Sequence, residues 1–120
     1  KKEMADRILE IGNYLEKLID EWRPETLAIE KLFFTTNQKT AMNVAETKGA
    51  ITYIAKNAGL TFREFTPLQI KIAITGFGKA DKNQIASMVR NLIDLSGKTK
   101  IIDDEYDAIA VALTCIASTR

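Results

Sequence analysis

The segment Thr26-Leu27-Ala28-Ile29-Glu30 decides how this chain folds. Its apolar run is too short for a helix and is typical of a strand buried within an α/β sheet. Glu30 then places a carboxylate at the carboxyl end of that strand. Ligands of open α/β sheets bind beyond this end of the strands. The segment therefore predicts an α/β fold and the place of a functional site within it.

On both sides of this strand, apolar residues recur at the spacing of helices. Steps of three and four predict a helix from about residue 2 to 22, which Pro24 ends. The elements predicted after the strand are a helix over about 39–57, a strand over 60–65, a short helix to about residue 73, a helix that ends near 96–97, and a last helix from 103 or 104. Strands separated by a helix imply a parallel pair, and only two strands make a thin sheet.

Local signals mark where several of these elements begin and end. Gly59 follows Asn57 and Ala58 and suits the left-handed position after a helix. Thr66 is a good N-cap, and Pro67 fits the first position of the helix that follows. With no internal repeat and no linker, the pattern predicts one domain over residues 1–120.

The composition is that of a folded globular domain. Hydrophobic residues make up 46% of the 120 residues and charged residues 28%, with two prolines. No apolar run is long enough to span a membrane and no signal-peptide pattern leads the chain, so we expect a cytoplasmic protein. The single Cys115 lies in an apolar helical stretch, which favours a small buried hydrophobic residue over a nucleophile.

Charge is segregated along the chain although the formal net charge is only +1. Residues 31–100 carry 11 basic and 4 acidic side chains, whereas acidic side chains outnumber basic ones before and after this segment. Such a distribution is expected of a polyanion-binding surface around an acidic site that holds cations. A solvated, scattered basic face would give the same count.

Glu30, Asp104 and Asp107 are the candidate metal ligands. Asp104 and Asp107 lie one helical turn apart and can reach the same cation. Mg²⁺ prefers oxygen ligands, and a pair of such ions can promote phosphodiester cleavage. Because the chain has no histidine, hydrolysis would depend on carboxylates and metal. Two alternatives stay open: the acids at residues 103–105 could cap their helix, and Glu30 could pair with a lysine.

Three stretches of the chain resemble the RuvC-type Holliday junction resolvases of bacteria. The first, Leu27–Phe34 (LAIEKLFF), is similar to the family's second acidic strand and the loop after it. The second is its central basic segment, matched by Thr66–Lys71 (TPLQIK) and Gly76–Lys82 (GFGKADK). The third, Asp104–Ala110 (DEYDAIA), resembles its closing acidic helix. The resemblance runs in order through nearly the whole chain.

The resemblance implies a ribonuclease H-like fold, here helix-rich with a reduced sheet and truncated at the N-terminus. It implies a structure-specific endodeoxyribonuclease, usually a homodimer, that resolves four-way DNA junctions by metal-dependent hydrolysis. The expected ion is Mg²⁺, with Mn²⁺ as the alternative, and the expected partners are junction DNA and branch-migration helicase proteins. Carried over by position, the resemblance makes Glu30, Asp104 and Asp107 catalytic metal ligands, Lys71 and Lys82 contacts to the DNA backbone, and Phe33 a stacking residue.

One departure from the family limits what we expect of these 120 residues. Family members carry an Asp-X-Gly motif on an early strand, whose Asp is the first metal ligand, and no such stretch occurs here. We therefore expect no appreciable nuclease activity from this chain alone, and an altered oligomer because sheet edges and apolar helix faces are left uncovered. The alternatives are a non-catalytic fragment that binds junctions or dimerises, and another ribonuclease H-like nuclease.

Overall fold

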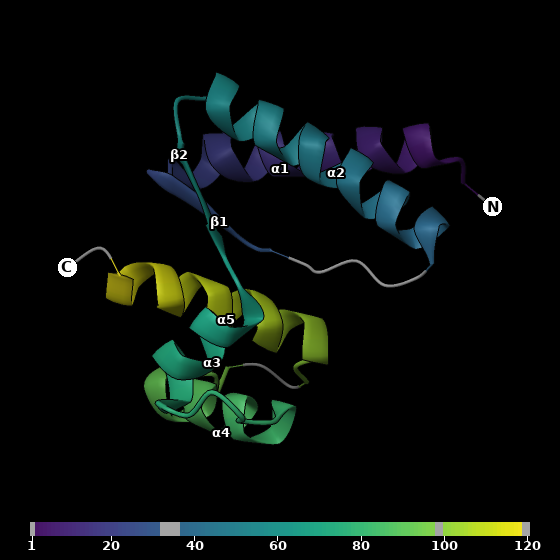
Figure 1. The fold of residues 1–120 in the computed structure, drawn as a ribbon. Helices are drawn as coiled ribbons and strands as arrows, with labels where there is room; N and C mark the ends of the chain where they lie inside the picture. The colour runs from purple at the N-terminus through teal and green to yellow at the C-terminus, as the bar shows by residue number, and fades with distance from the viewer. Residues whose placement is uncertain (1, 32–36, 98–99, 119–120) are drawn as a thin grey trace. The chain divides into compact units, whose positions relative to one another are not determined.

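The computed structural model describes residues 2–31, 37–97 and 100–118. In these residues five helices and two strands follow one another, and colour from purple to yellow traces their order in Figure 1. The elements are α1 (Met4–Trp22), β1 (Thr26–Glu30), α2 (Gln38–Asn57), β2 (Thr61–Phe65), α3 (Pro67–Thr75), α4 (Lys82–Leu92) and α5 (Asp103–Ser118). The order and type of every element agree with the sequence prediction.

β1 and β2 form a two-stranded sheet. The Thr61 N–H donates to the Glu25 carbonyl at 2.9 Å, and the Lys31 N–H donates to the Phe65 carbonyl at 2.7 Å. These two bonds advance along both strands in the same direction, as in a parallel pair. The predicted parallel pair and thin sheet are therefore confirmed.

The predicted signals at the element ends are also confirmed. Gly59 has a φ of 84°, in the left-handed region. The Thr66 hydroxyl accepts from the Gln69 N–H at 3.1 Å, and the Gln69 side chain accepts from the Thr66 N–H at 2.7 Å. This reciprocal capping box, with Pro67 at the start of the helix, fixes where α3 begins.

Two predicted helix ends were wrong. α4 was expected to reach residues 96–97, but it ends at Leu92, and Ile93 has extended backbone angles. The Asp94 carboxylate accepts a hydrogen bond from the Ser96 N–H at 2.9 Å, a local turn that competes with the helix. α3 continues to Thr75, beyond the predicted residue 73, because the left-handed Gly76 supplies its C-cap.

The chain divides into two compact units. The first comprises residues 1–27 and 33–62, and within it α1 packs against α2 (Figure 1). Gly12 is the buried residue of α1, and a Cβ built there would lie 3.1 Å from the Ile54 Cδ1 atom. A glycine at this position therefore allows the two helices to approach closely.

The second unit comprises residues 28–32 and 63–120 and contains an apolar core shared by β2 and the last three helices. The buried residues of this core are Phe65, Ile70, Ile74, Val89, Ala110, Val111 and Cys115. The prediction for Cys115 is confirmed, because its thiol is buried and free. Both strands contribute residues to both units, and one domain over residues 1–120 stays a prediction.

No helix within the described ranges has the length and apolar character needed to cross a membrane.

Replacement of Ile74 by alanine should destabilise the second unit by about 2–5 kcal/mol, because it opens a cavity in a packed core. Ile74 is 5% exposed, whereas Ile72 in the same helix is 51% exposed and provides a matched control. Ile72→Ala should cost less than about 1 kcal/mol. Urea unfolding followed by circular dichroism measures both, and equal losses would contradict this assignment of the core.

Candidate metal and nucleic-acid site

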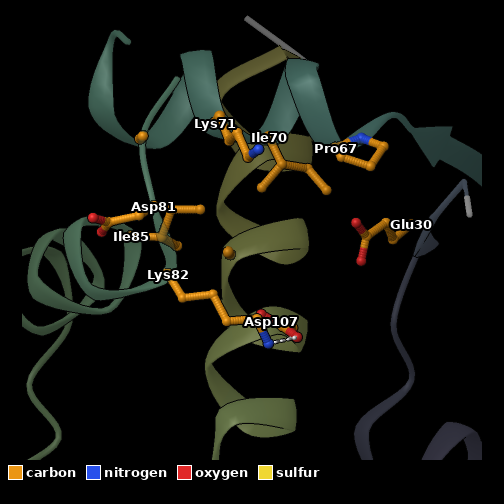
Figure 2. Close-up of a pocket in the computed structure, with 10 residues that line it drawn as sticks. Glu30, Pro67, Ile70, Lys71, Asp81, Lys82, Ile85 and Asp107 are labelled. Atoms are coloured by element: carbon orange, nitrogen blue, oxygen red, sulfur yellow. Dashed lines mark ion pairs between the residues drawn. The ribbon is translucent and has the colours of Figure 1, made fainter. Parts of the chain in front are cut away.

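A pocket of about 230 Å³ in the second unit collects four of the predicted site residues. Glu30 comes from the end of β1, Lys71 from α3, Lys82 from the start of α4 and Asp107 from α5 (Figure 2). The other lining residues are Pro67, Ile70, Ala80, Asp81, Ile85 and Ala110. Carboxylates and lysines far apart in sequence therefore share an apolar-walled pocket.

Packing fixes the helix that carries Asp107. Ala110, Val111 and Thr114 on the same helix are buried, and the Thr114 hydroxyl donates to the Ala110 carbonyl at 2.8 Å. Ala110 also lines the pocket, and Asp107 lies one turn before it on the same face. The core therefore fixes the backbone from which Asp107 reaches the pocket.

The two lysines are placed by the beginning and the buried face of their helices. Lys71 follows the buried Ile70 in α3 and lies on the rim of the core. Lys82 is the first residue of α4, directly after its N-cap Asp81. The Asp81 carboxylate accepts from the Gln84 N–H at 2.8 Å, and the Gln84 side chain accepts from the Asp81 N–H at 2.8 Å. This capping box holds the backbone from which Lys82 reaches into the pocket.

Lys82 forms an ion pair with Asp107, drawn as the dashed line in Figure 2. The Lys82 Nζ and Asp107 Oδ2 atoms are 3.7 Å apart, and the two side chains are 72% and 46% exposed. Exposed pairs of this kind contribute at most about 1 kcal/mol. Lys82 can therefore leave Asp107 for another anion at little cost.

The environment of Glu30 raises the pKa of its carboxyl group above the ordinary value of 4.5. Burial is the largest cause, and repulsion by Asp107 adds to it, while Lys82 and Lys71 act in the opposite direction. Within the described residues the structure shows no direct ion pair between Glu30 and a lysine. Two carboxylates thus repel each other across the pocket, as expected of a site that attracts a cation.

Asp104 does not line this pocket. It lies exposed in the first turn of α5, where acidic side chains suit the helix dipole. Nearby, the Glu105 carboxylate accepts from the Ile102 N–H at 3.3 Å, so the capping alternative describes part of this acidic segment. In the ranges that the structure describes, no three acidic or cysteine side chains lie close enough to hold a metal ion. A ligand role for Asp104 stays a prediction.

The remaining predicted site residue, Phe33, lies outside the described residues. Sequence reasoning also missed a contributor, since it did not assign Asp81 to the site. The spacing of Asp81 and Gln84 is a capping-box signal that could have identified it. The apolar wall of Ile70, Ala80 and Ile85 carries no comparable local signal.

A comparison with protein families matches residues 1–115 to the family described as crossover junction endodeoxyribonuclease RuvC. The chain belongs to the RuvC family. The RuvC of Caldicellulosiruptor saccharolyticus is 44% identical over 119 residues, which cover 99% of this chain and 70% of the relative. The RuvC of Ruminiclostridium cellulolyticum is 42% identical over 109 residues, covering 91% and 65% respectively. The chain thus spans about two thirds of the length of these RuvC relatives.

Solved RuvC structures match the fold as well. The chain is similar to a structure titled T. thermophilus RuvC in complex with Holliday junction substrate, with a TM-score of 0.92 and 30% identity over 99% of this chain and 72% of that one. A second Thermus thermophilus RuvC structure matches with a TM-score of 0.88 over 99% of this chain and 71% of that one. The predicted helix-rich, ribonuclease H-like α/β fold is confirmed.

Replacing Glu30 with glutamine should stabilise the metal-free protein at neutral pH. The raised pKa of Glu30 means that the folded state disfavours the charged carboxylate, a penalty that begins as pH rises above the unfolded-state pKa and is complete above the folded-state pKa. The advantage of Glu30→Gln over the parent should disappear below about pH 4, where the carboxyl group is protonated in both states. Thermal unfolding in EDTA across pH measures it.

Glu46→Gln, at an exposed position of α2, controls for the loss of one carboxylate. The prediction would be contradicted by a Glu30→Gln variant that is less stable than the parent at pH 7 and whose stability relative to the parent rises on acidification.

Proposed function

We propose that these 120 residues belong to a metal-dependent endodeoxyribonuclease that hydrolyses phosphodiester bonds at four-way DNA junctions, and that by themselves they have no appreciable cleavage activity because the family's first acidic ligand is absent from them. The observation that carries the proposal is a single pocket lined by two carboxylates and two lysines, those of Glu30, Asp107, Lys71 and Lys82. Phosphodiester cleavage needs cation ligands and phosphate-binding groups at one place, and this pocket supplies both. The match to a RuvC structure solved with a Holliday junction substrate supports the choice of substrate.

The carboxylates fit a hard divalent cation. Glu30 and Asp107 offer oxygen ligands from two different elements, and their mutual repulsion is what a cation would relieve. We assign Mg²⁺ to this site, with Mn²⁺ as the alternative and Asp104 as a further ligand from the preceding turn of α5. When bound, such an ion activates water and stabilises the leaving oxygen.

Lys71 and Lys82 would bind the phosphates of the cleaved strand. Each places an ammonium group beside the carboxylates, and Lys82 is tied only by a weak pair. Phe33 is proposed to stack on a base at the junction. A homodimer that works with branch-migration helicases completes the proposal by analogy with the family.

A second candidate function is junction binding without cleavage. It is favoured by the finding that Asp104 does not line the pocket, which leaves Glu30 and Asp107 as the predicted acids that do. For these 120 residues both candidates predict junction binding in EDTA and no product in Mg²⁺, so cleavage by this chain alone does not separate them. Binding of a divalent cation by the pocket carboxylates does, because a site that only binds DNA needs no cation. Robust nicking of a four-way junction in Mg²⁺ would contradict the expected inactivity of this chain.

Removal of either pocket carboxylate should weaken binding of a divalent cation. Loss of outer-shell partners alone typically costs 10–100-fold in metal affinity, so Glu30→Gln and Asp107→Asn should each cost at least about tenfold. Titration with Mn²⁺, followed by electron paramagnetic resonance, reports the free ion without requiring cleavage. Asp103→Asn is the matched control, since Asp103 is exposed in α5 and does not line the pocket.

The same titration on Asp104→Asn tests the third predicted ligand. Unchanged affinity would remove Asp104 from the proposed metal site. Unchanged affinity in both Glu30→Gln and Asp107→Asn would overturn the site itself.

Loss of either pocket lysine should weaken DNA binding at every sequence. Each phosphate contact contributes about 0.9 to the slope of log affinity against log salt, so Lys71→Gln and Lys82→Gln should each reduce that slope by about 1. Fluorescence anisotropy in EDTA, with a synthetic four-way junction and a linear duplex, measures slope and preference. Lys56→Gln, at an exposed position near the end of α2, is the control. An unchanged slope in both pocket variants would contradict the proposed phosphate contacts.

A further inference from the structure

The turn between α3 and α4 presents an aromatic side chain to which the family resemblance assigns no role. Phe77 lies between Gly76 and Gly78 and is 51% exposed. An exposed phenylalanine side chain is unfavourable, because each Å² of apolar surface left in water forgoes about 25 cal/mol of burial free energy. Hydrogen bonds and close packing of the neighbouring residues hold its backbone in place.

Hydrogen bonds hold the turn on either side of Phe77. The Thr75 hydroxyl accepts from the Phe77 N–H at 3.0 Å. The same hydroxyl lies within donating distance of the Phe77 carbonyl, at 3.1 Å, and of the Lys71 carbonyl, at 2.7 Å. The Phe77 carbonyl also accepts from the Ala80 N–H at 3.1 Å. The backbone of Phe77 is thus hydrogen-bonded both to Thr75 of α3 and to Ala80, which lines the pocket.

The two glycines make this close arrangement sterically accessible. Gly76 has a φ of 76°, which other residues rarely adopt. A Cβ at Gly78 would lie 3.0 Å from the Leu68 Cδ1 atom, so the turn packs directly on α3. The ring of Phe77 is therefore displayed from a defined turn, as a binding residue should be.

Lysines lie on either side of Phe77 along the chain and point to the chemistry of its partner. The Thr75 hydroxyl bonds both the Lys71 carbonyl and the Phe77 N–H, Lys79 follows in the turn, and Lys82 begins α4. Lys71 and Lys82 line the pocket, as does Ala80, whose N–H bonds to Phe77. An exposed aromatic ring on a turn between two helices that carry pocket lysines is an arrangement suited to nucleic acid, with a base on the ring and phosphates on the lysines.

We propose that Phe77 is a DNA-binding residue that stacks on a base exposed at the branch point of a junction. The proposal rests on the proposed function, since it places the base next to phosphates held by Lys71 and Lys82. A protein partner is the competing occupant, because Leu68 and Ile72 are also exposed. The lysines of this segment, Lys71, Lys79 and Lys82, favour a polyanion over such a partner.

The experiment compares junction affinity of Phe77→Ala, Phe77→Leu and Phe77→Trp by anisotropy in EDTA over a range of salt. Loss of one stacked base should weaken binding roughly 5- to 100-fold in the alanine and leucine variants. The salt slope should not change, because no charge is lost. Phe77→Trp should restore affinity. Leu92→Ala is the control, since Leu92 is 54% exposed at the end of α4 and lines no site described above.

A junction carrying 2-aminopurine at the branch point reports stacking directly. Its fluorescence should change on binding the parent protein but not on binding Phe77→Leu, and the same probe in linear duplex should respond to neither. Full affinity in Phe77→Leu would overturn the proposal, since leucine keeps apolar contact but cannot stack. So would an oligomeric state that changes in light scattering of DNA-free Phe77→Ala.

Lys71→Gln separates this inference from the function on which it rests. If Lys71→Gln weakens junction binding and Phe77→Ala does not, the stacking role alone is overturned. If Lys71→Gln and Lys82→Gln both leave junction binding unchanged, the proposed function fails, and the stacking role fails with it.

Discussion

Glu30 and Asp107 face the same pocket, and the repulsion between their carboxylates is what the surrounding structure must offset. Burial and Asp107 together raise the pKa of Glu30, while the lysines of α3 and α4 only partly counter this shift. Repelling charges stay close only where rigid elements hold them. The core beneath them, with Val89 and Ala110 almost fully buried, supplies that rigidity. Packing in the second unit thus maintains an electrostatic arrangement that is unfavourable by itself.

Lys82 is held more loosely than the two carboxylates, and this difference suits its role. Glu30 sits at the end of a hydrogen-bonded strand, and Asp107 lies on a helix that the core fixes. The Lys82 side chain is 72% exposed and makes only a 3.7 Å pair. Cation ligands must be placed to within a fraction of an ångström, whereas an ammonium group on a flexible stem can follow a phosphate.

The sequence predicted local features well because each depends on a few neighbouring residues. The left-handed Gly59 and the Thr66 cap follow from local backbone geometry, and the strand that ends in Glu30 follows from its short apolar run. α4 ended early because the turn at Asp94 competes with the helix, a balance that apolar periodicity does not measure. Likewise, i, i+3 spacing placed Asp104 beside Asp107 but could not show which acid the pocket includes.

Cation and phosphate binding at this pocket are linked, if both use the residues that line it. A cation held by Glu30 and Asp107 would remove the negative charge that now engages Lys82, freeing that lysine for a phosphate. A phosphate bound by Lys71 and Lys82 would add negative charge beside the carboxylates and so favour the cation. By reciprocity, each ligand must strengthen the other by the same factor. The weak pair between Lys82 and Asp107 keeps the cost of this exchange low, because exposed pairs contribute at most about 1 kcal/mol. The pocket is thus suited to assembling cation and DNA together.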